Sequence, residues 1–176
     1  MNLRKYCPED WKEVVKLFHD TVHSVNSDDY DEAQLNAWAP NDMGLIKLDN
    51  RLSGNYSVVA EKSGVIVGFG NANGPGYFDC LYTHKDYQRI GVATLIAEDI
   101  EKYFFREGIQ IITTDASITA KPFFEKRGYI VQKRQNVECR GQFFTNFKMR
   151  KTLRLSQYLK TIYNNPVNVK RKTGQS

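Results

Sequence analysis

The 176-residue sequence lacks several patterns that would assign it to a class at once. It has three cysteines, and no two of them form a CxxC pair. We therefore expect reduced thiols rather than a disulfide framework or a zinc site. No apolar run approaches the roughly 20 residues of a membrane-spanning helix, and the first residues lack the apolar core of a secretory signal. The expectation is a cytoplasmic protein without a membrane-embedded part.

Two further absences limit the chemistry. The sequence contains neither a GxxxxGK[ST] phosphate loop nor an HExxH metal frame. His19 and His23 are four residues apart on a predicted helix and share a face. Two histidines do not complete a metal site, so no metal is expected.

Acidic residues are missing from the C-terminal end. Residues 151–176 carry six basic and no acidic residues, which leaves 19 basic and 20 acidic residues for residues 1–150. Residues 1–150 therefore lack the excess of basic residues that is typical of a nucleic-acid-binding protein. We expect one domain over residues 1–150 and a basic tail over 151–176, helical in part near 152–163. Nucleic acid is expected as a partner only through this tail, and the chain as a monomer or homodimer.

The apolar patterns that are present predict a mixed sheet. Strands are expected at 1–6, 56–61, 65–72, 77–83, 109–115, 129–138 and 142–150. Helices are expected from Pro8 onward, over 31–38, 43–53, 92–107 and 119–127. A helix between strands 77–83 and 109–115 makes these two strands parallel. The predicted fold class is α+β, with a mostly antiparallel sheet, a central parallel strand pair and flanking helices. Strand 109–115 is so apolar that burial on both faces is expected.

The stretch QRIGVAT, residues 88–94, stands at the start of the long predicted helix. Helix-start amides are unpaired and carry the positive end of the helix dipole. The small residues Gly91 and Ala93 would let an anion approach them closely, and Arg89 would add a charged contact. The spacing therefore predicts a diphosphate site, although a glycine here is also compatible with a simple turn.

The same stretch resembles a known family motif. Residues 88–93 are similar to the Q/R-x-x-G-x-G/A motif of the GCN5-related N-acetyltransferases, the GNAT superfamily. Residues 117–129, SITAKPFFEKRGY, are similar to a second motif of this superfamily. VNSDDYDEAQLNAWAP, residues 25–40, resembles a bacterial branch of acetyltransferases with a QxxAWAP signature. The resemblance covers residues 1–150 and implies the GNAT fold.

The resemblance also implies a co-substrate, acetyl-CoA, and the residues that bind it. Its pyrophosphate would be bound by Arg89, Ile90, Gly91, Val92, Ala93 and Thr94. Backbone groups of Leu81, Tyr82 and Thr83 would face the thioester and the pantetheine arm. Ser117 replaces the family asparagine that contacts pantetheine. Phe124 replaces the tyrosine that often protonates the departing thiolate, and a phenyl ring cannot donate that proton.

Acceptor and catalytic residues are expected near the same strand. Tyr77, Asp79 and Leu81 alternate onto one face of strand 77–83. Asp79 is the first candidate for the general base, with a paired structural aspartate as the alternative. Tyr82 is a candidate proton donor or else a core tyrosine, and His84 is a second candidate base or else a loop residue.

Tyr30 and Trp38 resemble the wall on the acceptor side and would bind substrate together with Tyr77; plain core residues are the alternative. The leading hypothesis is an acetyl-CoA-dependent N-acetyltransferase that acts by direct attack of a primary amine on a small molecule or peptide. Cys80 has no partner that suggests a thiol nucleophile. One alternative is a non-catalytic acyl-CoA-binding regulatory domain, which Phe124 suggests. The other is an acetyltransferase directed to RNA or the ribosome by the basic tail.

Overall fold

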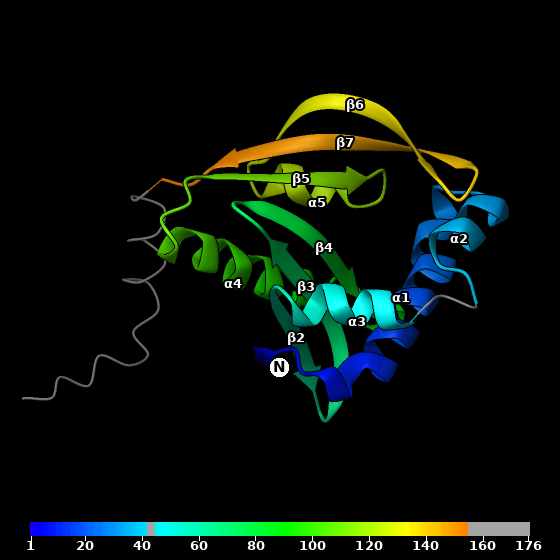
Figure 1. Ribbon diagram of the computed structural model, residues 1–176, viewed down its shortest axis with the longest axis horizontal. Helices are drawn as coiled ribbons and strands as arrows, with labels where there is room; N and C mark the ends of the chain where they lie inside the picture. Colours follow the sequence, from blue (N-terminus) through cyan, green and yellow to red (C-terminus); the bar gives the residue numbers. More distant parts are fainter. Residues whose placement is uncertain (42–44, 155–176) are drawn as a thin grey trace, which may run out of the picture.

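The computed structural model describes residues 1–41 and 45–154, which form a seven-stranded sheet between two sets of helices (Figure 1). The strands are β1 (Asn2–Lys5), β2 (Tyr56–Lys62), β3 (Val65–Asn73), β4 (Tyr77–Thr83), β5 (Ile111–Ser117), β6 (Ile130–Cys139) and β7 (Gln142–Thr152). The α-helices are α1 (Trp11–Val25), α2 (Glu32–Trp38), α3 (Leu45–Ser53), α4 (Val92–Arg106) and α5 (Lys121–Lys126). Short 3-10 turns η1 (Pro8–Asp10), η2 (Asn26–Asp28) and η3 (Lys85–Tyr87) complete the elements.

The strand order is β1-β2-β3-β4-β5-β7-β6. Every neighbouring pair is antiparallel except β4 and β5, which are parallel because α4 connects them. The predicted α+β class, with a mostly antiparallel sheet and a central parallel pair, is confirmed.

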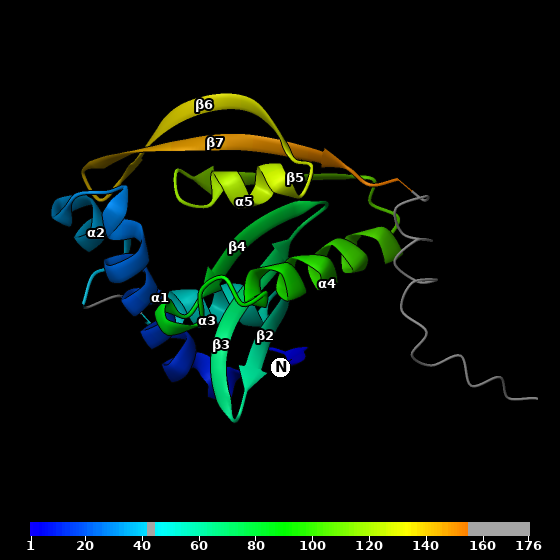
Figure 2. The same ribbon diagram turned by 180° about the vertical axis from the view of Figure 1, so that it is seen from behind.

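Helices cover both faces of the sheet, as the opposite views in Figures 1 and 2 show. Helices α1, α2 and α3 pack on one face in a cluster that includes Phe18, Leu52 and Phe69. Helix α4 packs on the other face in a second cluster, which includes Ile96 and Phe104. Adjacent valines of β2 point to opposite clusters, so the pleat of the strand supplies both cores.

Close packing of α4 against β3 depends on glycine. A Cβ at Gly70 would lie 2.6 Å from Cγ2 of Ile96 and 3.1 Å from the carbonyl oxygen of Cys80. Gly68 is equally crowded, with Cγ1 of Val92 at 2.5 Å from the added atom. The two glycines therefore bring the start of α4 close to the centre of the sheet.

The structure differs from the sequence prediction at β5. Its side chains alternate in exposure, with Ile112, Thr114 and Ala116 buried and Ile111 43% exposed. The expectation of burial on both faces is wrong because helices cover only one face of the sheet at this strand, and Asp115 is exposed on the other.

The C-terminal end of the described chain belongs to the sheet. Strand β7 continues to Thr152, and the Leu153 side chain is 7% exposed. Lys151 forms an ion pair with Glu101 of α4 at 2.9 Å. The helix expected near residues 152–163 lies outside the described residues except for its first positions, where the structure has strand. In the described part of the chain, no helix is long and apolar enough to cross a membrane.

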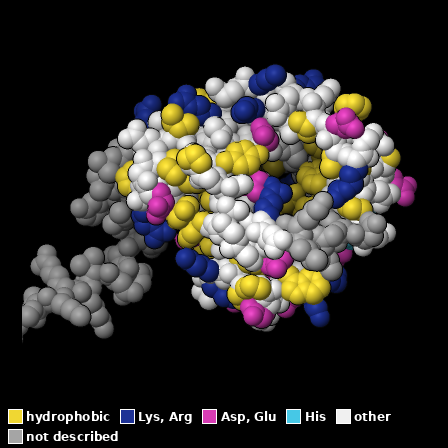
Figure 3. All heavy atoms as spheres, viewed as in Figure 1, with side chains coloured by type: hydrophobic (Ala, Val, Ile, Leu, Met, Phe, Trp, Pro, Cys, Tyr) yellow, Lys and Arg dark blue, Asp and Glu magenta, His cyan; other side chains and the backbone are white. Residues whose placement is uncertain are grey.

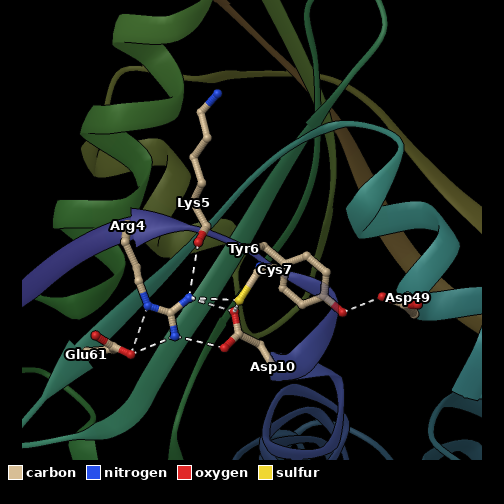
Figure 4. A network of polar contacts seen from close by, with 7 residues as sticks. All are labelled: Arg4, Lys5, Tyr6, Cys7, Asp10, Asp49 and Glu61. Carbon is tan, nitrogen blue, oxygen red and sulfur yellow. Dashed lines mark hydrogen bonds and ion pairs between the residues drawn. The ribbon is translucent and has the colours of Figure 1, made fainter.

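A polar network ties the N-terminal segment to the sheet (Figure 4). Arg4 of β1 donates to Asp10 at 2.7 Å and 2.8 Å, and to Glu61 of β2 at 2.7 Å and 2.9 Å. Tyr6 donates to Asp49 of α3 at 2.6 Å. The network joins β1, η1 and β2, and Tyr6 links this segment to α3.

Candidate active site

The loop between β4 and α4 prepares the start of α4 for an anion. Gly91 precedes the helix with a φ of 91°, in the left-handed region that favours glycine. A Cβ at Gly91 would meet no atom within 4 Å, so the space beside it is open. Among the described residues, none caps this helix through its side chain, and the first turn contains no acid. The Leu95 amide bonds to the Gly91 carbonyl at 3.0 Å, which leaves the amides before it for an outside acceptor.

The six predicted pyrophosphate residues follow one another around this helix start. Arg89, Ile90, Gly91 and Thr94 are exposed, Ala93 is half-buried and Val92 is buried. Val92 packs in the cluster beneath α4 and anchors the turn. The structure therefore brings the expected amides to one accessible surface.

Gln88 closes this loop against β4. Its Nε2 donates to the carbonyl of Thr83 at 2.6 Å and to that of His84 at 3.2 Å. Thr21 of α1 donates to the same Thr83 carbonyl at 3.0 Å. The Thr83 carbonyl, one of the backbone groups expected to face the thioester, is thus used by the protein itself.

Strands β4 and β5 separate from each other next to this loop. In the described sheet they pair at Tyr77 and Thr113 alone, where the Thr113 amide donates to the Gly76 carbonyl at 2.8 Å. Beyond this point β4 runs away from β5, as Figure 1 shows. The divergence leaves one side of β4 without a neighbouring strand.

A bulge in β4 changes which side chains share a face. Asn71 of β3 pairs with Cys80 and Ala72 pairs with Phe78, so Asp79 is the inserted residue. Asp79 and Cys80 consequently both line a cavity on the side of the sheet that carries α1, α2 and α3. Leu81 packs on the opposite side, in the cluster beneath α4. The expected alternation of Tyr77, Asp79 and Leu81 onto one face is wrong at Leu81 for this reason.

A cavity of about 600 Å³ opens on the face covered by α1, α2 and α3. Figure 3 shows this face hollowed near its centre, with basic and acidic side chains next to each other in the hollow. The lining comes from three helices, the loop before α2, four strands and the turn between β6 and β7. The lining residues are Phe18, Tyr30, Trp38, Leu48, Arg51, Tyr77, Asp79, Cys80, Tyr82, Asp115, Ser117, Val137, Cys139, Arg140, Phe144, Thr145 and Asn146.

Three aromatic side chains, Tyr30, Trp38 and Phe144, form what we call the aromatic wall of the cavity. The Tyr30 ring lies 5.3 Å from the Trp38 ring and 5.7 Å from the Phe144 ring, and Trp38 and Phe144 are 5.9 Å apart. The Tyr30 hydroxyl donates to the Thr145 carbonyl at 3.2 Å and accepts from the Ile118 amide at 3.0 Å. Its hydrogen bonds fix Tyr30 between α2 and the sheet.

Charged groups lie at the β4 side of the cavity. Arg51 of α3 forms a two-pronged ion pair with Asp79, whose side chain is 4% exposed. The Tyr77 hydroxyl donates to Asp115 at 3.2 Å, and Gln135 donates to the other oxygen of Asp115 at 3.3 Å. Burial, and then the nearby carboxylates, raise the pKa of Tyr77 above its ordinary value.

Tyr82 lies between Phe18 and Phe69, with ring centroids 4.8 Å and 5.3 Å away. Burial raises the pKa of Tyr82, so the hydroxyl stays protonated at neutral pH. Burial also raises the pKa of the neighbouring Cys80 thiol to about 12. Neither the Tyr82 hydroxyl nor the Cys80 thiol is therefore readily deprotonated in this cavity.

The remaining predicted residues are also accounted for. Ser117 lines the cavity, and its Oγ accepts from the Ala120 amide at 3.0 Å before α5. Phe124 is 3% exposed and packs in the core against Phe78. His84 accepts from the Asp86 amide at 3.2 Å and caps η3 outside the cavity lining.

Sequence reasoning missed several lining residues, which are Arg51, Asp115, Arg140, Phe144 and Asn146. Alternation along strand 142–152 could have placed Phe144 and Asn146 on one face. No local pattern marks Arg51 or Arg140, because their positions beside the cavity depend on how α3 and the turn between β6 and β7 pack.

Comparisons with known proteins agree with this geometry. A family described as an acetyltransferase (GNAT) domain matches residues 26–153. The chain is 37% identical over 150 residues to the uncharacterized N-acetyltransferase YafP of Escherichia coli strain K12, covering 85% of this chain and 95% of that protein.

Two solved structures have the same fold. A GCN5-related N-acetyltransferase from Rhodopseudomonas palustris superposes with a TM-score of 0.84 at 38% identity, covering 86% of this chain and 95% of that one. The PaiA N-acetyltransferase of Thermoplasma acidophilum, solved in complex with coenzyme A, has a TM-score of 0.71 at 16% identity, covering 86% and 98%.

Proposed function

The chain belongs to the GNAT acetyltransferase family, and we propose that it moves the acetyl group of acetyl-CoA directly to a primary amine held in the cavity. The observation that carries this proposal is the open start of α4 beside the divergent end of β4. Arg89, Ile90, Gly91 and Thr94 are exposed there, Gly91 is left-handed, and no acid of the first turn competes with a phosphate. The likeness to a protein solved with coenzyme A supports the same site.

In the proposed reaction the amine must first lose a proton, because an ammonium has no lone pair. Asp79 is the proposed acceptor of this proton. Arg51 holds both carboxylate oxygens of Asp79, so Arg51 must release one of them in this step. The amine nitrogen then forms a bond to the thioester carbon as the carbon–sulfur bond breaks, and the nitrogen gives up a second proton, which restores the one that the departing sulfur takes from its donor.

The departing sulfur needs a proton, and Tyr82 is the proposed donor. It lines the cavity and stays protonated because burial raises its pKa. Phe124 cannot serve, since it is an apolar side chain buried in the core. Tyr30, Trp38 and Tyr77 are the proposed contacts of the acceptor.

Substitution of Gly91 by Glu tests the acetyl-CoA site. A carboxylate beside the open amides would repel the pyrophosphate, and we expect acetyl-CoA affinity to fall at least roughly tenfold in calorimetry. Gly108→Glu is the matched control, because Gly108 lies near the opposite end of α4 with a φ of 75° and equally open space. Equal affinity for Gly91→Glu and the parent would overturn the site.

The buried Phe124 also supports a second candidate, a domain that binds acyl-CoA without catalysis. A screen of amines with thiol release as the readout separates the two, since turnover on any amine ends the non-catalytic reading. The hypothesis of a tail-directed acetyltransferase for RNA or the ribosome depends on residues that lie mostly outside the described chain.

A further inference from the structure

Asn146 lies in a row of polar side chains that crosses the open part of the sheet. In the register of the sheet, Asn146 of β7 is opposite Ser117 of β5 on one side and opposite Gln135 of β6 on the other. Directly opposite residues share a face, so the three form what we call the polar row. Ser117 and Asn146 both line the cavity next to the aromatic wall.

Asn146 is the member of the polar row with a buried polar atom that lacks a partner. Its Oδ1 exposes less than 1 Å² and has no hydrogen-bond partner among the described residues. Ser117 accepts from the Ala120 amide, and Gln135 donates to Asp115. A buried carbonyl oxygen without a partner is costly, and native structures rarely keep one without a reason.

The neighbours of Asn146 in the cavity have partners of their own. The Tyr30 hydroxyl both donates and accepts within the protein, and the Tyr77 hydroxyl donates to Asp115. Arg51 and Asp79 hold each other. Because Asn146 lines the cavity, a rotation of its side-chain amide would present the buried, unpartnered Oδ1 to an N–H group that enters along the aromatic wall.

The chemistry of an amide oxygen suits a reacting amine. A carboxylate would favour the ammonium form, which cannot attack a thioester, whereas a neutral amide oxygen accepts a hydrogen bond from the neutral amine. The nitrogen keeps its lone pair for the reaction while one N–H is held. The apolar body of the same molecule would lie against Tyr30, Trp38 and Phe144.

We propose that Asn146 positions the acceptor amine through its Oδ1, and that the acceptor is a primary amine with an aromatic or similarly compact apolar body. This inference rests on the proposed acetyltransferase function. It assigns Asn146 a positioning role and makes the aromatic wall the determinant of acceptor class.

The experiment measures acetylation of 2-phenylethylamine, ethylamine and spermidine by the full chain and by two Asn146 variants, at pH values from 6 to 10. For the parent we expect kcat/KM for 2-phenylethylamine to exceed that for the other two amines at least tenfold. Asn146→Leu, similar in size but without the oxygen, should raise KM for 2-phenylethylamine about tenfold and leave the pH profile unchanged.

Asn146→Asp provides the second, sharper readout. The new carboxylate would favour the ammonium, so kcat should fall about tenfold at pH 7 and recover as the pH rises. The other titratable or charged groups that line the cavity are Tyr30, Arg51, Tyr77, Asp79, Cys80, Tyr82, Asp115, Cys139 and Arg140. They are the same in the parent and the variant, so a change of pH profile reports on position 146.

Asn2→Leu, at an exposed strand position on the far edge of the sheet, is the control and should behave as the parent. Unchanged KM in Asn146→Leu together with an unchanged pH profile in Asn146→Asp would overturn the role of Asn146. A parent that prefers ethylamine or spermidine would overturn the acceptor class. A parent that binds no acetyl-CoA or acetylates no amine would instead remove the proposed function and this inference with it.

Discussion

Asp79 illustrates how a single residue changes the site. Strict alternation along β4 would direct Asp79 and Leu81 toward the cavity, but the bulge at Asp79 brings Cys80 and Tyr82 there in place of Leu81. Bulges re-aim side chains in this way. The sequence YFDCLYT contains no glycine or proline that would have revealed the bulge. The catalytic roles of Asp79 and Tyr82 remain predictions.

Cys80 gives a test at the scale of one residue. Because burial raises the pKa of its thiol to about 12, very little thiolate exists at pH 8, where a free thiol with a pKa of about 8.5 is substantially ionised. We expect Cys80 in the native protein to react with iodoacetamide roughly a thousandfold more slowly than glutathione at pH 8. Mass spectrometry of the peptide that contains residue 80 measures this rate.

The same protein unfolded in urea is the control, because Cys80 should then react like glutathione. Direct transfer also needs no thiol nucleophile, so Cys80→Ala should retain turnover. Rapid labelling of native Cys80, or loss of turnover with unchanged acetyl-CoA binding, would contradict this description of the residue.

Among the elements, the position of α4 matters most for the proposed site. Its start presents the amides, and its contact with β3 depends on two glycines that carry no side chain between the sheet and the helix. Both glycines lie in the strand predicted over residues 65–72, and no local pattern marks them as a packing site. Their packing role depends on α4 crossing β3, which the sequence order alone does not specify.

Gly70→Ala should therefore weaken both the fold and the acetyl-CoA site. The added Cβ would lie 2.6 Å from Ile96, and overpacking of this kind costs about 1–3 kcal/mol. Urea unfolding measures the loss of stability, and calorimetry measures the loss of acetyl-CoA affinity. Gly74→Ala, in a turn with a φ of 52° where an added Cβ meets no atom within 4 Å, adds backbone strain without overpacking and should leave acetyl-CoA affinity unchanged. Equal acetyl-CoA affinity of the two variants would argue against close packing of α4.

The Arg4 network gives a pH-dependent prediction for the N-terminal elements (Figure 4). Burial alone would raise the pKa of Asp10, but hydrogen bonds from Arg4 and from the Cys7 amide and thiol lower it overall. A lowered native pKa stabilises the fold above the ordinary value of about 4, and this contribution disappears as the pH falls through the native pKa.

Arg4→Met should consequently reduce the free energy of unfolding by about 1–2 kcal/mol at pH 7, since the Arg4 side chain is one third exposed and solvent weakens its charged hydrogen bonds. The difference between parent and variant should shrink below about pH 4. Urea unfolding at pH 7, 4 and 3 measures it, with Lys133→Met, at an exposed position of β6, as the control. A difference that grows toward pH 3 would contradict this account.

For the whole molecule, the C-terminal limit of the folded unit is testable. The sequence predicted a domain over residues 1–150, but Lys151 pairs with Glu101 and the Leu153 amide donates to the Gln110 carbonyl at 2.7 Å. We expect a protein ending at Arg154 to be as stable as the full chain. A protein ending at residue 150 should lose about 2 kcal/mol or more, mainly through the lost leucine, because Glu101 keeps its ion pair with Arg127.

Thermal unfolding of the two truncated proteins and the full chain measures this difference. Equal stability of all three would favour the boundary expected from the sequence. Equal loss in both truncated proteins would instead assign a stabilising role to residues 155–176.

The sequence by itself determined the order of the elements, the parallel pair and the helix start at residues 88–94 for which we propose phosphate binding. These are local properties, because apolar periodicity defines each element and a few consecutive amides define the helix start. Tertiary structure alone decided the cavity. Arg51 meets Asp79 from another element, the aromatic wall joins Tyr30 and Trp38 to Phe144 of β7, and the Oδ1 of Asn146 has no hydrogen-bond partner among the described residues. Such contacts depend on how distant segments pack against one another, and no local pattern of residues specifies that packing.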